Sequence, residues 1–224
     1  MPLLSHRVTI CGIPELPQHS STGVTHVLSI IDTHEPRPGA LDDFFGIDHE
    51  LIRFDDVVAE YPGFEACTPA HIEKVLAFGE RAQKNLDGHM LVHCHAGVSR
   101  SQAAAAILMA QHAPGREEAA FLRLLELRKH GWPNTRMVEF ADEILDRKGA
   151  LMNGLLAYRR ALIDAKPHLR EIIRNIGRGH ELLAFVGGDA AHGGRRVEER
   201  HGHRRRHRPA PGCDLAVSGP HRLV

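Results

Sequence analysis

Cysteine, aromatic residues, long apolar runs and net charge are all scarce in this sequence. The 224 residues include four cysteines, and aromatic residues make up 5% of the chain. So few cysteines, without the spacing of a zinc site or a disulfide scaffold, predict reduced thiols in the cytosol. No run of about 18 apolar residues occurs, so neither export nor membrane crossing is expected. The 28 basic and 28 acidic side chains cancel, so no overall field favours nucleic acid or a membrane.

The composition is that of a globular domain with a real core, because 42% of the residues are hydrophobic. Four short apolar runs with β-forming residues lie in the first part of the chain, at 7–11, 24–31, 50–54 and 89–94. Polar stretches and helix-length segments separate them, a pattern typical of a parallel sheet covered on both faces. The sequence therefore predicts an α/β fold with a central, mostly parallel sheet flanked by helices.

Helical periodicity occupies residues 69–85 and returns from residue 101 onward. The Pro-Gly pair at 114–115 is expected to end the first helix of the second group. Asn134 is suited to cap a later helix, which Gly149 would end.

The chain divides into three parts by composition. Residues 1–149 carry the α/β pattern, and residues 150–186 predict a helical extension packed on it. Residues 187–224 are rich in Gly, Arg and His, have little to bury and are expected to stay disordered. This tail could instead bind anions or nucleic acid weakly, or take up metal through three histidines, His201, His203 and His207.

The stretch HCHAGVSRS, residues 93–101, stands between a strand-like run and a helix-forming run. Cys94 is the only one of the four cysteines that an arginine, Arg100, follows six positions later. A strand, a short loop and a helix N-terminus make an anion site, because unpaired N–H groups point inward and the helix dipole adds positive potential. The stretch therefore predicts a phosphate-binding loop formed by His95, Ala96, Gly97, Val98, Ser99 and Arg100.

The residue types of this loop suit nucleophilic chemistry on a phosphate. A helix N-terminus and a nearby cation favour the thiolate form of Cys94, which is the nucleophilic form. Gly97 allows the backbone to curl around an anion, and the planar fork of Arg100 can bind two phosphate oxygens. Ser101 can donate a hydrogen bond to the sulfur, which would help Cys94 to depart in a second step.

This stretch resembles the His-Cys-x5-Arg-Ser/Thr signature of the cysteine-dependent protein tyrosine phosphatases, and most of all their dual-specificity branch. The similarity extends over roughly residues 5 to 148. The resemblance implies a metal-independent hydrolase without a cofactor, acting on a phosphorylated protein or a small phosphate ester. It implies a phosphocysteine intermediate on Cys94, and a general acid that is an aspartate some tens of residues upstream.

The segment IRFDDVVAEYPGF supplies two aspartates for that role. Ile52 and Phe54 alternate as inward-facing strand residues, and continuing the alternation brings Asp56 to the same side. We therefore expect Asp56 to be the acid, with Asp55 as the alternative.

Other interpretations remain for the same residues. A thiol-based arsenate reductase or sulfurtransferase would use a similar anion loop, and a non-catalytic phosphate-binding module would keep the loop without turnover. His93 is expected to support the loop and His95 to line its rim, with no metal site between them. Cys11 and Cys67 are expected to be structural, although a second thiol near Cys94 could form a protective disulfide.

Overall fold

The computed structural model describes residues 3–84 and 87–185. The described residues form two compact units, which divide between His168 and Leu169. The expectations for the tail at 187–224 lie outside the described residues.

The first unit is built on a four-stranded sheet in the order β1-β4-β2-β3, with every neighbouring pair parallel. The predicted α/β fold with a parallel sheet is confirmed. All residues of the central strands β2 and β4 are buried, as expected for a sheet covered on both faces. The strands are β1 (Arg7–Gly12), β2 (His26–Ile31), β3 (Asp48–Arg53) and β4 (His89–Cys94).

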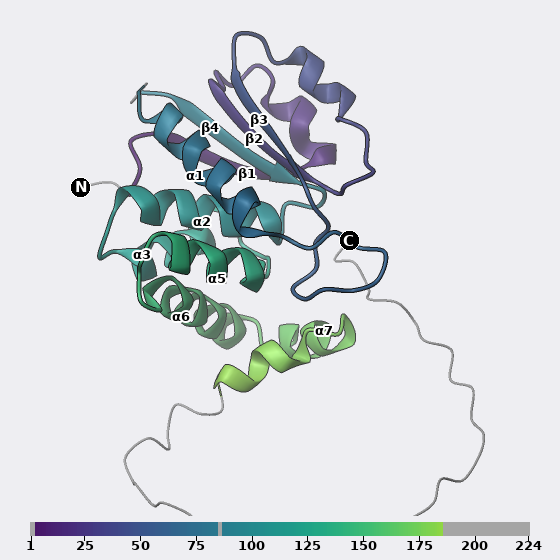
Figure 1. The fold of residues 1–224 in the computed structure, drawn as a ribbon, viewed down its shortest axis with the longest axis vertical. Coiled ribbons are helices and arrows are strands. Elements are labelled where there is room, and N and C mark those ends of the chain that lie inside the picture. The colour runs from purple at the N-terminus through teal and green to yellow at the C-terminus, as the bar shows by residue number, and fades with distance from the viewer. Residues whose placement is uncertain (1–2, 85–86, 186–224) are drawn as a thin grey trace, which may run out of the picture. The chain divides into compact units, whose positions relative to one another are not determined.

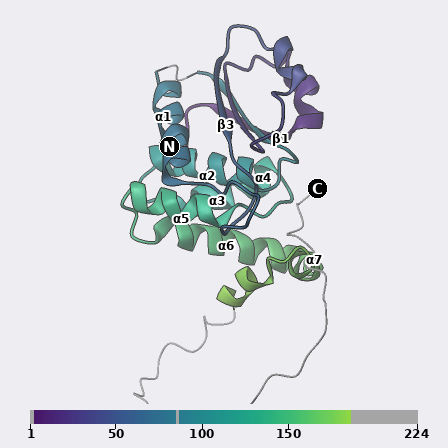
Figure 2. The same ribbon diagram turned by 45° about the vertical axis from the view of Figure 1, so that its right-hand side comes forward.

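Helices cover one face of this sheet, and two short 3-10 helices cover the other (Figures 1 and 2). Helices α1 and α2 pack directly on the strands, and α3, α5 and α6 form a further layer behind them. The bounds are η1 (Ile13–His19), η2 (Gly39–Asp43), α1 (Pro69–Ala82), α2 (Arg100–His112), α3 (Glu117–Leu122), α4 (Leu124–Leu127), α5 (Thr135–Ile144) and α6 (Ala150–Ala165).

The ends of α5 test two of the predicted helix signals. Asn134 caps the helix as expected, since its side-chain oxygen accepts the Met137 backbone N–H at 3.2 Å. Gly149 does not end α5, which stops at Ile144. Gly149 instead precedes α6 with φ +88°, and its N–H donates to Asp142 of α5 at 2.6 Å. The prediction that Gly149 ends the helix was wrong because a left-handed glycine also serves in the turn that starts the next one.

Helix α6 belongs to the first compact unit, so the expected boundary at residue 149 falls inside that unit. It packs on α3 and α5, and Gly154 permits close approach, because a Cβ there would lie 2.8 Å from the Phe121 ring. Its buried residues include an apolar stripe of Leu151, Leu155, Tyr158 and Leu162.

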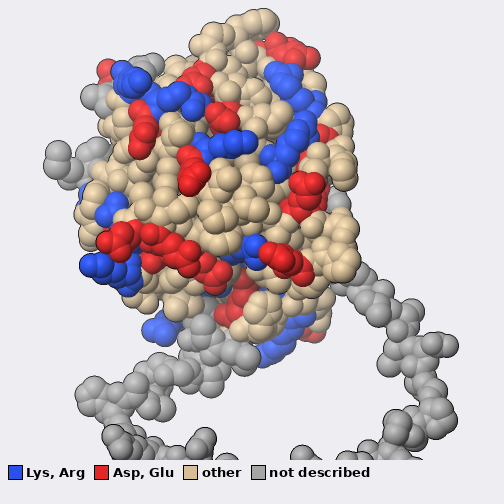
Figure 3. Space-filling view, viewed as in Figure 1, with Lys and Arg blue, Asp and Glu red and all other residues tan. Residues whose placement is uncertain are grey.

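The described part of the second unit consists of α7 (Leu169–Asn175) and η3 (Gly179–Phe185). Within it the Arg178 guanidinium donates to both carboxylate oxygens of Glu181, at 2.8 and 2.9 Å. None of the helices in the described ranges combines the length and the apolar character that a bilayer crossing requires. Figure 3 shows acidic and basic side chains interspersed on the face it presents.

Candidate active site

The four parallel strands bring residues from distant parts of the chain to one edge of the sheet. Cys94 ends β4, Asp32 follows β2, Phe54 and Asp56 follow β3, and Gly12 ends β1. The carboxyl ends of parallel strands are where open α/β sheets bind ligands. The Cys94 loop is therefore placed where side chains from all four strand ends can contribute.

Carbonyl groups of the Cys94 loop point away from its inner side. A trans peptide unit points its N–H opposite to its C=O, so the N–H groups of Ala96, Gly97 and Ser99 face the inner side. Converging amides of this kind form a concave anion-binding surface. Three carbonyl oxygens of the loop accept hydrogen bonds from residues outside it: His95 O from the Ile13 N–H at 2.9 Å, Ala96 O from Nη2 of Arg128 at 3.2 Å, and Val98 O from the Trp132 N–H at 2.7 Å.

Gly97 is required by the path of the backbone. Its φ is +73°, and a Cβ at this position would lie 2.5 Å from the carbonyl carbon of Cys11. Any side chain would therefore meet both an unfavourable dihedral angle and the backbone of β1.

The Cys94 thiol lies at the bottom of the loop, beside the start of α2. Its Sγ atom is 3.2 Å from the Ser101 hydroxyl, and both residues are buried. The N-terminus of α2 carries the positive end of the helix dipole. The sulfur thus lies beside both a hydroxyl group and the N-terminus of α2.

The Arg100 guanidinium is buried and held on two sides. Its Nη1 donates to the carbonyl of Phe54 at 2.5 Å, and its Nη2 pairs with the Asp32 carboxylate at 2.8 Å. Its Nε has no acceptor in the described ranges of the chain. Burial opposes the charge, but Asp56, Cys94 and Asp32 together raise the pKa of Arg100. The guanidinium is thus a pre-oriented cation, and two of its five N–H groups are engaged by these contacts.

The two aspartates of the loop after β3 have different surroundings. The Asp55 carboxylate accepts the Glu65 N–H at 2.8 Å, and the Asp55 N–H donates to the Glu65 carbonyl at 2.7 Å, which closes the base of the loop. The Asp56 carboxylate instead accepts the Ser99 hydroxyl at 2.8 Å. The structure thus brings Asp56 to the Cys94 loop, whereas Asp55 holds the shape of the loop after β3.

Two polar residues at this edge were missed as site residues from the sequence. Asp32 directly follows the buried strand β2, and the convergence of parallel strand ends was a signal that could have found it. Asn134 was assigned only a capping role, yet its Nδ2 donates to Asp56 Oδ1 at 2.9 Å. No local pattern indicates that contact, which joins residues 78 positions apart.

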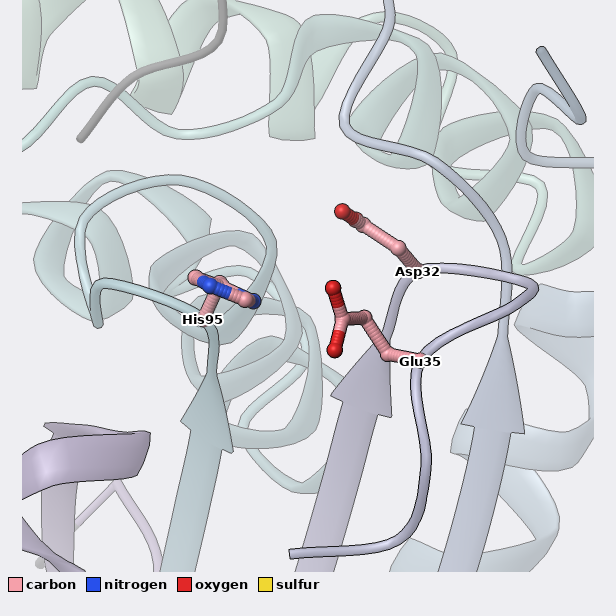
Figure 4. A group of neighbouring side chains, drawn as sticks. All are labelled: Asp32, Glu35 and His95. Atoms are coloured by element: carbon pink, nitrogen blue, oxygen red, sulfur yellow. The ribbon is translucent and has the colours of Figure 1, made fainter. Parts of the chain in front are cut away.

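Asp32 lies beside two further polar side chains at the rim of the loop. Figure 4 shows Glu35 and His95 directed toward one another beside Asp32, and ligand atoms of all three lie within 4.8 Å of one another. His95 thus lies at the rim, where the sequence predicted it. The Asp32 carboxylate of this group also pairs with the Arg100 guanidinium at 2.8 Å.

His93 is the start of a buried hydrogen-bond chain behind the loop. Its Nε2 lies 2.6 Å from the Ser29 hydroxyl, which in turn lies 2.8 Å from Nε2 of His49. Burial lowers the pKa of His93 to about 4, although a hydrogen bond with the Cys94 backbone raises it in part. Burial also lowers the pKa of His49. A neutral His93 therefore supports the loop and does not act as its cation.

The neutral His93 predicts a loss of stability in mild acid. Below pH 6.5 this imidazole becomes protonated in the unfolded chain, whereas in the folded chain it stays neutral until about pH 4. The free energy of unfolding should fall across that interval by about 3 kcal/mol from this residue. Denaturant titrations between pH 7 and pH 4 measure the decrease.

The matched comparison is His93→Gln, which cannot titrate. Its unfolding free energy should depend on pH more weakly than that of the wild type, by about the same 3 kcal/mol. Parallel pH dependences for His93→Gln and wild type would contradict the assignment.

Cys11 and Cys67 are buried free thiols. Burial raises the pKa of each to about 12, with Glu15 adding to the effect at Cys11. Both thiols are therefore protonated near neutral pH and poorly nucleophilic.

Comparisons with known proteins find similarity in structure. No model of a protein family and no curated protein matches the sequence. Human DUSP28 is similar with a TM-score of 0.48 and 21% identity, over 64% of this chain and 94% of that one. A mouse putative dual specificity phosphatase complexed with zinc tungstate has a TM-score of 0.45 and 23% identity, over 62% and 79%.

The human tyrosine phosphatase-like serine/threonine/tyrosine-interacting protein is similar with a TM-score of 0.46 and 20% identity, over 62% of this chain and 87% of that one. PTPMT1, solved in complex with PI(5)P, is another, with a TM-score of 0.47 and 16% identity over 67% of this chain and 96% of that one.

Proposed function

We propose that this chain is a cysteine-dependent phosphatase of the dual-specificity type, which hydrolyses phosphomonoesters through a phosphocysteine intermediate. The observation that carries the proposal is the Arg100 guanidinium, oriented by Asp32 and Phe54 with its Nε unpaired, above a loop whose amides face inward. A buried donor without an acceptor is costly unless an anion completes it. A phosphoryl group fits this arrangement in charge and in geometry.

In the first step the Cys94 thiolate attacks the phosphorus of the bound ester. The S–P bond forms as the bond from phosphorus to the leaving oxygen breaks, and the Asp56 carboxylic acid protonates that oxygen. The loop amides and Arg100 stabilise the charge on the equatorial oxygens, because they are oriented before the reaction starts.

In the second step a water molecule attacks the phosphocysteine. Asp56, now a carboxylate, accepts a proton from the water, and the S–P bond breaks to release inorganic phosphate and the Cys94 thiolate. The Ser101 hydroxyl, 3.2 Å from the sulfur, stabilises the departing thiolate. The cycle consumes one water and needs neither a metal ion nor a cofactor.

The alternatives require features that the described residues supply less well. A thiol-based reductase needs a resolving thiol, whereas burial raises the pKa of Cys11 and Cys67 to about 12. A sulfurtransferase needs a sulfur donor instead. A non-catalytic phosphate-binding module does not need a carboxylate beside the loop, whereas the Asp56 carboxylate is hydrogen-bonded to Ser99 of the loop. The substrate on this proposal is a phosphorylated protein or a small phosphate ester.

The covalent intermediate is the direct test. The protein is mixed with an aryl phosphate labelled in its phosphoryl group, in the presence of a metal chelator, and quenched with denaturant during turnover. We expect label on Cys94, none on Cys94→Ser, and a turnover rate that the chelator does not change. Turnover without label on Cys94, or turnover abolished by chelator, would contradict the mechanism.

A further inference from the structure

A pocket of about 420 Å³ lies beside the edge strand β1, between this strand and the helices α2, α3 and α4. Its lining residues from β1 are the first two of the strand, Arg7 and Val8. In the parallel register Arg7 pairs with His89 at the start of β4, and Cys94 ends that strand. The pocket is therefore at the opposite end of the sheet from the Cys94 loop, about 17 Å away along a six-residue strand.

The walls of the pocket are apolar, and basic side chains surround them. Two of the apolar side chains, Leu4 and Met109, are buried. The three arginines of the lining are exposed, and none of the described residues that line the pocket is acidic. Apolar walls beside three cations are complementary to a molecule that carries a negative charge on a hydrocarbon body. The apolar lining residues are Leu3, Leu4, Val8, Met109 and Leu127, and the arginines are Arg7, Arg116 and Arg123.

The remaining lining residue, His6, is buried without a hydrogen-bond partner. It is 5% exposed, and neither of its ring nitrogens has a partner in the described ranges of the chain. Packing fixes the ring, since it lies edge-on to His26 with 5.3 Å between the centroids, and a Cβ at Gly88 would lie 2.8 Å from its Cδ2 atom. A neutral imidazole keeps one N–H donor, which is unfavourable to bury without an acceptor. An anionic oxygen atom in the pocket would supply that acceptor.

Two of the arginines are placed so that they can contact a ligand. The Nη2 atom of Arg7 donates to the Thr22 carbonyl at 3.2 Å and lies 2.9 Å from Nδ1 of His89, which holds this guanidinium at the pocket. The Arg123 side chain is 48% exposed and pairs with Glu126 at the surface. An exposed pair of this kind contributes little stability, so the Arg123 guanidinium can turn to an anion in the pocket.

We propose that this pocket binds a small amphipathic anion, namely a carboxylate on a short hydrocarbon chain, at a site separate from the Cys94 loop. The hydrocarbon chain packs against Leu4 and Met109, and the carboxylate meets the arginines and His6. A carboxylate suits these partners because its two oxygen atoms accept paired hydrogen bonds from a guanidinium. A volume of about 420 Å³ is that of a site for one small molecule. Binding at this site does not depend on turnover at Cys94, so it goes beyond the proposed function.

The probe is octanoate, used below its micellar concentration, and the readout is the NMR spectrum of protein with isotope-labelled methionine methyl groups. Met109 lies in the pocket, whereas Met137 is buried in α5 and is not part of the lining, so the two methyl groups provide a reporter and an internal control. Met109→Leu assigns the reporter signal. We expect octanoate to shift the Met109 signal in a saturable way and to leave the Met137 signal unchanged. Octanol, which has the same chain without the charge, should bind at least about tenfold more weakly.

Substitutions of the polar lining residues test their contacts. In the double variant with Arg116→Gln and Arg123→Gln, the dissociation constant of octanoate should rise about tenfold or more, while that of octanol stays the same. His6→Phe keeps a ring without its nitrogen atoms and should weaken octanoate binding by about threefold to tenfold. Arg160→Gln, at an exposed arginine of α6 outside the pocket, is the matched control and should bind octanoate as the wild type does. Thermal unfolding of each variant shows whether the fold is kept.

Equal affinities for octanoate and octanol, or wild-type affinity for octanoate in the double variant, would overturn the inference. So would a Met109 signal that millimolar octanoate leaves unchanged. Failure of the proposed function gives a separate result, since a chain that does not turn over aryl phosphates would still bind octanoate in this pocket.

Discussion

Replacing Cys94 with serine is expected to lower kcat for an aryl phosphate by at least about 10⁴-fold. The serine hydroxyl fits in the same place but is not ionised near neutral pH, so it lacks the nucleophilic anion that the loop stabilises. The backbone amides and Arg100 stay in position. Binding of a phosphate ester should therefore persist while turnover is lost.

Steady-state kinetics and a binding titration with a phosphotyrosine peptide measure the two effects separately. Cys67→Ser is the matched control, because Cys67 is also buried but lies outside the loop and should tolerate the change with activity retained. Activity of Cys94→Ser within tenfold of the wild type would remove Cys94 from the chemistry.

Replacing Arg100 with lysine is expected to lower kcat/KM by about 10²- to 10⁴-fold although the charge is kept. An ammonium is a point charge and cannot make the two parallel bonds of a guanidinium. Loss of two charge-assisted hydrogen bonds, at about 1.5–3 kcal/mol each, gives a range of this size. The inhibition constant of inorganic phosphate should rise in the same variant.

Arg81→Lys provides the comparison for this substitution. Arg81 pairs with Asp48 and Glu50 at the start of β3, away from the Cys94 loop, so its replacement should leave the kinetics unchanged. Thermal unfolding of both variants shows whether either has lost its fold. A loss of less than tenfold in folded Arg100→Lys would mean that Arg100 does not bind the phosphoryl group in the transition state.

Much of the fold was predictable because its signals are local. The apolar runs that became β2 and β4 are buried along their whole length, so their composition differs clearly from their surroundings. The strand predicted at 50–54 began two residues earlier, at Asp48, where polar residues pair with β2. Backbone pairing placed them in the sheet, and hydrophobicity does not report on backbone pairing.

The candidate site also contains some residues that the sequence could predict and some that it could not. Cys94, Gly97 and Arg100 lie within one short segment, so their relation was visible in the order of the residues. The contact between Asn134 and Asp56 joins positions that are 78 residues apart and depends on how α5 is placed relative to β3. A capping asparagine looks the same in a sequence whether or not its amide has a second partner.

The order of residues along the chain was enough to predict a loop suited to an anion, with a thiol and a guanidinium at its two ends, because one strand end and one helix start define that loop. Only the tertiary structure decided the surroundings of Asp55 and Asp56, the ion pair between Asp32 and Arg100, and the neutral state of His93. These properties arise where parallel strands end together, since proximity and burial there depend on strand order and register rather than on neighbours in sequence.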